Sequence, residues 1–67
     1  MTAREKAAVQ AFNIVRREAA LAAAAYERGE DAAGDAHSDM VRDALAAAKR
    51  GGYFGTFSLL AHRWSRR

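Results

Sequence analysis

The side chains best suited to chemistry in this sequence are two histidines and a short run of acids. Neither His37 nor His62 has another histidine or a cysteine at the spacing that zinc ligands need. The acids from Asp31 to Asp39 lack the alternating oxygen ligands and the terminal glutamate of a calcium-binding loop. We therefore expect no metal site, and we interpret His37 as a helix-packed side chain and the acids as helix caps and solvated charge.

The residue pattern does not indicate catalysis or cofactor binding. A nucleophilic serine, threonine or lysine needs a base and a cleft that holds both, and a few thin helices offer little cleft. The glycines at 51, 52 and 55 do not follow a strand, so they indicate a helix end and a tight turn instead of a phosphate-binding loop. We expect a non-enzymatic protein with no catalytic residue and no cofactor.

With 67 residues and no cysteine, the chain is predicted to form one domain over 1–67 without disulfides. Alanine dominates its hydrophobic fraction of 51%, and an alanine side chain buries little area. A domain of this size buries only about 60% of the surface of its unfolded chain. Helix packing, self-association or a partner must therefore supply the stability.

The first helix is predicted over about residues 2–28. Thr2 and Glu5 form a capping-box pattern at its start, and no proline or glycine interrupts the chain until Gly29. Helical spacing then predicts one inward face, made of Ala8, Phe12, Val15, Ala19, Ala22, Ala23 and Tyr26.

The second helix is predicted over about residues 35–50 and ends at Gly51 and Gly52. Three residues compete as its N-cap, namely Asp31, Asp35 and Ser38. Its apolar face is expected to consist of Ala33, His37, Met40, Val41, Ala44, Leu45 and Ala48.

A third, C-terminal helix is predicted over about residues 54–65, because no second strand exists to pair with this aromatic segment. Four large side chains at helical spacing are expected to fold back and complete the core, namely Tyr53, Phe57, Leu60 and Trp64. The predicted fold is all-α: a long antiparallel helical hairpin (about 2–28 and 35–50) and a short C-terminal helix (about 54–65) in a small three-helix domain.

Charge is polarised along the chain. Residues 29–43 carry five acids and one arginine, whereas residues 44–67 carry five basic side chains and no acid, within a net charge of +3. No apolar run approaches the roughly 18 residues of a membrane span, and the first residues lack the apolar stretch of a signal peptide. We expect a cytoplasmic protein with a basic C-terminal end.

Two groups of residues are predicted to bind a partner. Ile14 and Leu21 lie seven residues apart amid the polar side of the first helix, beside Arg17, and form an apolar stripe that a monomeric hairpin leaves exposed. Because interfaces favour apolar anchors and guanidinium groups, we expect a protein partner there, or a homodimer through the first helix. Such a chain fits a small regulator or steric inhibitor of a larger protein or complex, as phages and mobile elements encode. The second group is the arginine patch of Arg63, Arg66 and Arg67.

One segment resembles the helix-turn-helix family of DNA-binding regulators. Ala47, Gly51, Phe57 and Leu60 have the spacing in which the alanine lets two helices approach and the glycine makes the turn. The aromatic, glycine-interrupted second helix departs from that family. The resemblance implies a nucleic-acid partner for residues 44–66, on a surface that includes Thr56, Ser58, Leu59, His62, Arg63 and Arg66.

A further alternative is binding to a membrane surface through the C-terminal helix, since Trp64 and its arginine neighbours suit a headgroup boundary. The same rings are needed to cover Phe12, Val15 and Tyr26 in so small a core. Membrane binding is therefore the less favoured interpretation.

Overall fold

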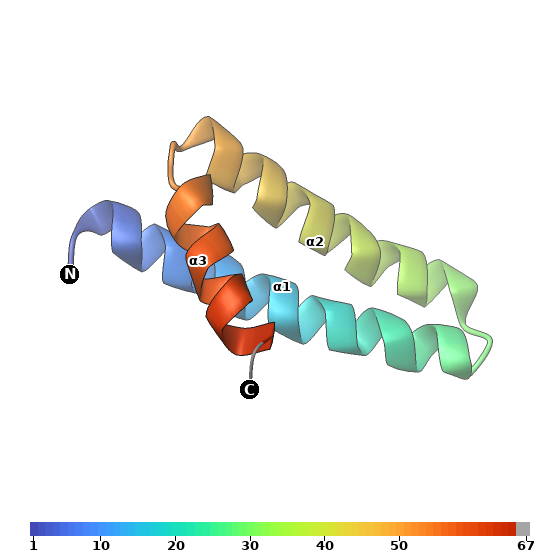
Figure 1. The fold of residues 1–67 in the computed structure, drawn as a ribbon. Helices are drawn as coiled ribbons and strands as arrows, with labels where there is room; N and C mark the ends of the chain where they lie inside the picture. The colour runs from blue at the N-terminus through green and yellow to red at the C-terminus, as the bar shows by residue number, and fades with distance from the viewer. Residues whose placement is uncertain (66–67) are drawn as a thin grey trace.

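Three α-helices joined by two short turns make up the protein in the computed structural model, which describes residues 1–65. Helix α1 spans Ala3–Glu27, α2 spans Asp31–Arg50 and α3 spans Phe54–Ser65. Helices α1 and α2 form an antiparallel hairpin, and α3 crosses the N-terminal half of α1 on one side of it (Figure 1). No strand occurs within residues 1–65, and the predicted all-α three-helix fold is confirmed.

The ends of the helices are set by local hydrogen bonds and by two glycines. The Glu5 amide donates to the Thr2 hydroxyl at 3.1 Å, and the Thr2 amide donates to the Glu5 carboxylate at 3.1 Å, so the predicted capping box is present. Gly29 and Gly52 have φ angles of 76° and 74°, a left-handed conformation that L side chains rarely adopt. These two glycines reverse the chain after α1 and after α2.

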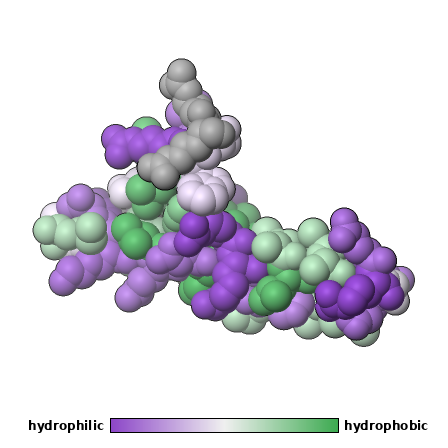
Figure 2. Space-filling view, turned by 90° about the horizontal axis from the view of Figure 1, so that it is seen from below, coloured by the Kyte–Doolittle hydropathy of each residue, from purple (hydrophilic) through white to green (hydrophobic). Residues whose placement is uncertain are grey.

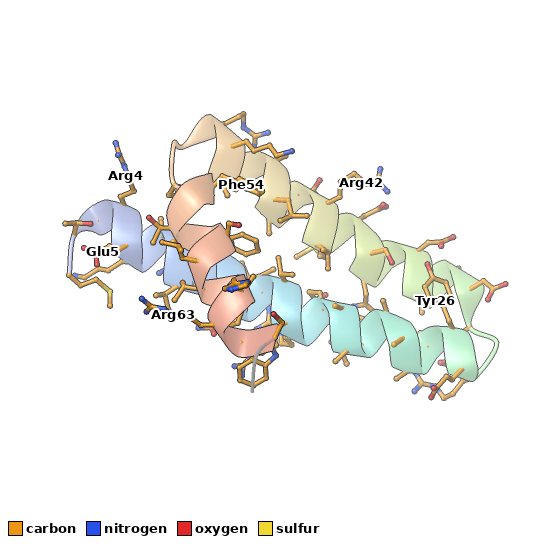
Figure 3. All side chains as sticks on the ribbon, viewed as in Figure 1. Arg4, Glu5, Tyr26, Arg42, Phe54 and Arg63 are labelled. Carbon is orange, nitrogen blue, oxygen red and sulfur yellow. The ribbon has the colours of Figure 1, made fainter. Side chains whose placement is uncertain are left out.

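Helix α2 begins at Asp31, one turn earlier than the predicted start near residue 35. Its N-cap is Glu30, which makes no capping bond with its side chain, so none of the three predicted candidates, Asp31, Asp35 and Ser38, caps α2. Asp35 and Ser38 instead interact with α1. The Tyr26 hydroxyl donates to an Asp35 carboxylate oxygen at 2.6 Å and lies 3.4 Å from Ser38 Oγ. The bond to Asp35 raises the pKa of Tyr26 above its ordinary value of 10.0. These groups tie α1 to α2 beside the turn, where Figure 3 shows Tyr26 lying between the two helices.

Small side chains line the contact between α1 and α2. Its buried residues are Ala11, Glu18, Ala22 and Ala25 on α1 and Gly34 and Ala48 on α2. Ala19 and Ala23 are exposed, so the prediction that they pack inward is wrong. Tyr26 is 43% exposed, but its ring packs on Gly34 of α2. Helix α1 has two different partners: its small residues pack against α2, whereas the larger Phe12 and Val15 pack against the core under α3. The sequence predicted one inward face for this helix, so it did not distinguish these two contacts.

A small core lies where α3 crosses the hairpin. Phe57 is only 5% exposed and packs on Ala8 and Ala11. Partly buried residues surround it, namely Phe12, Val15, Leu45, Tyr53, Leu60 and Ala61. No large side chain within residues 1–65 is completely buried. The fold therefore has a thin core with few large residues inside it.

Trp64 lies at the edge of this core and is 47% exposed, so the prediction that its indole completes the interior is wrong. Its ring meets Phe12 edge-on, with centroids 6.1 Å apart, and the guanidinium carbon of Arg16 stands 4.8 Å from its centroid. An indole that touches a ring on one side and a cation on another needs no enclosed site.

Replacement of two glycines by alanine is expected to change the free energy of unfolding in opposite directions. A helical glycine costs up to about 1 kcal/mol relative to alanine, so its replacement normally stabilises a helix. A Cβ added at Gly34 stands 2.5 Å from the Tyr26 ring, which must leave Asp35 to make room, whereas nothing lies within 4 Å of a Cβ at Gly55. We expect Gly55→Ala to raise the free energy of unfolding by about 0.5–1 kcal/mol and Gly34→Ala to lower it, in urea denaturation followed by circular dichroism. Equal stabilisation by both substitutions would contradict the packing of Tyr26 on Gly34.

Candidate functional site

A hollow of about 350 Å³ lies between the N-terminal end of α1 and one side of α3. Its lining combines apolar and polar residues, namely Met1, Val9, Leu59 and Leu60 with Glu5, Thr56 and Arg63. Leu59 is 60% exposed. In Figure 3, Arg63 extends from α3 toward the N-terminal end of α1, on the side where Glu5 lies, while Arg4 points the other way. A guanidinium group thus stands beside an exposed apolar surface.

A second hollow of about 230 Å³ adjoins the first and shares Leu60 and Arg63 with it. Phe12 and Trp64 complete its lining. The guanidinium carbon of Arg16 lies 5.8 Å from the Phe12 ring centroid and 4.8 Å from that of Trp64. We call the two hollows together the α1–α3 groove. Leu59, Leu60, Arg63 and Trp64 are among the residues that line it, and Arg16 lies beside Trp64.

The structure retains part of the predicted arginine patch. Arg63 lines both hollows, whereas Arg66 and Arg67 lie outside the described residues. Arg16 was not predicted as a site residue, although it follows Phe12 by four residues and therefore lies beside that ring on α1. The crossing of α3 adds the second ring, Trp64.

The residues predicted to contact DNA are divided between two sides of α3. Thr56 lines the first hollow together with Arg63. Ser58 and His62 line neither hollow and are exposed. Leu59 lines the first hollow as well. The fold therefore brings three of these residues to the α1–α3 groove and leaves two elsewhere, with Arg66 beyond the described part of the chain.

Ile14, Arg17 and Leu21 lie on the side of the hairpin that α3 leaves uncovered. The line of buried alanines on α1 separates them from Phe12 and Val15, which pack under α3. Ile14 is half-buried and Leu21 is 42% exposed. The predicted apolar stripe is thus present on the surface of the described chain, although only its Leu21 end is open to solvent.

Helix α2 adds apolar residues to this same side. Met40 is 46% exposed and Ala33 is exposed, so the prediction that both pack inward is wrong. By helical position they lie on the flank of α2 away from Leu45, which belongs to the core under α3. We call this surface the hairpin face. It consists of Ile14, Leu21 and Ala24 on α1 and Ala33, Ala36, Met40, Ala44 and Ala47 on α2.

A buried carboxylate, Glu18, lies in the middle of the alanine contact between α1 and α2. His37 Nδ1 donates to its Oε1 at 2.8 Å, and Arg17 Nε donates to its Oε2 at 3.1 Å. Glu18 was not among the residues that the sequence singled out. The signal was available: Glu18 stands four residues from Ile14 and from Ala22, and His37 was the one polar member of the apolar face predicted for the second helix.

The environment of Glu18 favours its charged form. The hydrogen bond from His37, and after it the bond from Arg17, lower the pKa of the Glu18 carboxyl below its ordinary value of 4.5, against the opposing effect of burial. Both carboxylate oxygens are bonded, and no buried side-chain nitrogen or oxygen within residues 1–65 lacks a partner. This polar pair is therefore a satisfied link between the two helices.

Within 1–65, no three histidine, cysteine, aspartate or glutamate side chains come together as a metal site requires. None of the three described helices is long and apolar enough to cross a membrane. Comparison of the chain with protein-family models, with curated proteins and with solved structures found no match.

The hydrogen bonds of Glu18 predict how the stability of the protein depends on pH. Because the folded state lowers the pKa of Glu18 below 4.5, the unfolded chain takes up the proton first as the pH falls. The stabilisation by ionised Glu18 is full above pH 4.5 and is lost as the pH drops through the folded-state pKa. We expect Glu18→Gln to be less stable than wild type at pH 6, with the difference shrinking below pH 4.5 in urea melts. Glu27→Gln, at an exposed position near the turn, serves as the control and should leave the acid limb unchanged.

Proposed function

We propose that this chain is a non-enzymatic protein-binding module and that the α1–α3 groove is its contact surface for a larger protein. The observation that carries the proposal is the pair of adjoining hollows around Arg63, with an exposed Leu59 on one side and Trp64 on the other. Trp and Arg are the residue types most enriched among those that dominate binding energy at interfaces.

The shape of the groove supports a protein segment as its occupant. The two hollows, of about 350 and 230 Å³, lie side by side along α3 and share Leu60 and Arg63. Two adjoining apolar hollows accept two neighbouring side chains of one extended or helical segment. The one carboxylate that lines them among the described residues, Glu5, is held by the Thr2 amide. Its role in the helix cap supports binding and not acid–base chemistry.

The charge near the groove favours an acidic partner. Arg63 and Arg16 flank it, and residues 44–67 contain five basic side chains and no acid. A guanidinium group recognises a carboxylate through paired hydrogen bonds, which gives direction as well as attraction. We therefore propose a partner segment with apolar side chains beside an aspartate or glutamate.

The size of the chain suggests how binding could act on the partner. A 7.3 kDa protein can change the action of a larger protein by covering part of its surface. We propose a regulator or steric inhibitor on this ground. To occupy the partner's own binding surface is then enough to regulate or inhibit that partner.

Two steps test the proposed function. First, a photo-crosslinking residue placed at position 59 should capture one discrete protein in the native host, and one placed at the exposed position 62 should not. Second, Leu59→Ala and Arg63→Ala should each weaken binding of the captured protein about tenfold, since interface anchors cost more than about 1 kcal/mol when truncated. Isothermal titration calorimetry measures both affinities.

His62→Ala is the matched control, because His62 is exposed on α3 and lines neither hollow. It should change the dissociation constant less than twofold, or about 0.4 kcal/mol. Equal losses at positions 59, 62 and 63 would contradict the assignment of the groove. Tight binding of random duplex DNA that disappears between about 50 and 200 mM salt would favour the nucleic-acid alternative instead.

A further inference from the structure

We propose that the hairpin face, on the side of the molecule opposite the α1–α3 groove, binds a second copy of this chain. In the resulting dimer, α1 and α2 of one copy pack against α2 and α1 of the other. This inference is independent of the proposed function, which uses the groove on the other side.

Helix α3 covers only one side of the hairpin. Figure 2 shows α3 standing on one side of the α1–α2 layer, over the N-terminal half of α1, with no helix on the opposite side. The two sides also differ in composition away from α3. On the α3 side, the exposed groups near the turn are Tyr26, Asp35 and Arg42 with small alanines, whereas the opposite side carries the larger apolar side chains Leu21 and Met40 among alanines, with Arg17 beside them.

The molecule exposes more surface than a compact monomer of its mass. Its accessible surface is 4784 Å², whereas a compact protein of 7.3 kDa exposes about 4,200 Å². Its radius of gyration is 12.8 Å, against about 11 Å for a compact domain of this length. The excess of roughly 600 Å² approaches the 800 Å² that each partner buries in an interface of standard size. A second copy on the hairpin face would cover an area of this order.

The small residues of the hairpin face suit a helix as the occupant. Five alanines stand among Ile14, Leu21 and Met40, so an approaching helix meets knobs of different size with shallow spaces between them. The contact between α1 and α2 has this same character, with alanines against alanine and glycine. The hairpin face therefore repeats on the outside the kind of surface that the two helices already bury between them.

Charges at the two borders of the hairpin face favour one arrangement of the copies. By helical position, Arg17 lies at the α1 side of the hairpin face, and Asp39 and Asp43 border it on α2. The bonds from Glu18 to His37 and from Tyr26 to Asp35 align the two helices so that Arg17 lies level with Asp39 and Asp43. A two-fold axis parallel to the helices keeps these heights and places α1 of one copy antiparallel to α2 of the other. This arrangement brings Arg17 of each copy next to Asp39 and Asp43 of the other, whereas α1 on α1 brings like charges together.

The oligomeric state of the intact chain tests the proposal. Sedimentation equilibrium at about 100 μM should give twice the mass of 7.3 kDa for the wild type. Leu21→Glu and Met40→Glu should each give the monomer mass with unchanged helical circular dichroism, since glutamate is a good helix former. Leu59→Glu, which alters an exposed leucine in the groove, should remain a dimer and separates this surface from the proposed function.

The wild type alone provides a second measurement that does not depend on the folding of any variant. If a dimer forms, its melting temperature rises with protein concentration, because association stabilises the folded state. A wild type that sediments as a monomer and melts at the same temperature from about 10 μM to 1 mM would overturn the proposal. Dimeric Leu21→Glu and Met40→Glu proteins would also overturn it.

Exchanged charges test the arrangement of the two copies. A variant with Asn13→Glu and Ala20→Glu, two exposed positions level with Asp43 and Asp39, makes the α1 border acidic. A variant with Asp39→Lys and Asp43→Lys makes the α2 border basic opposite Arg17. Each alone should dimerise at least about threefold more weakly than wild type, because like charges then meet. An equimolar mixture should recover the affinity as a heterodimer. A mixture that associates no better than either variant would refute the antiparallel packing of α1 on α2.

Discussion

The close contact of α1 and α2 through alanine and glycine is the constraint on which the rest of this structure depends. Ala11, Ala22 and Ala25 oppose a surface that includes Gly34 and Ala48, and side chains this small let two helix backbones approach closely. Such a contact buries little area for each residue. The large apolar side chains must therefore act elsewhere, either under α3 or on the outside of the hairpin.

Because the large apolar side chains lie away from the α1–α2 contact, the short helix α3 determines both the core and the hollows beside it. Phe57, at 5% exposure, is the one large apolar side chain among residues 1–65 that is buried, and the rings and leucines around it remain partly open to solvent. The same crossing that buries Phe57 creates the two hollows beside it, since Leu60 belongs to the core and also lines both of them. Stability and the candidate binding surface consequently share residues, and a partner that fills the groove also supports the fold.

Glu18 and His37 fix the alignment of α1 along α2, in a contact that otherwise consists mainly of small side chains. Alanine against alanine tolerates sliding of one helix along the other, because successive turns present the same shape. A carboxylate buried between the helices must keep its hydrogen-bond partners, and displacement by one turn would separate it from His37. The pair, together with the Tyr26 bond to Asp35, selects one alignment of the hairpin.

The sequence by itself determined the number of helices, the capping box at Thr2 and Glu5, and the two turns at Gly29 and Gly52, because these follow from residues close together in the chain. It also indicated an exposed stripe at Ile14 and Leu21. Only the tertiary structure decided which partner each face of α1 meets, that Trp64 stays at the edge of the core, and that Arg16 and Arg63 border one groove. The reason is physical: helical spacing reports that a residue has an apolar side, but an alanine-rich helix is apolar over much of its surface. The choice among its faces depends on the shapes and charges that the other two helices bring to it.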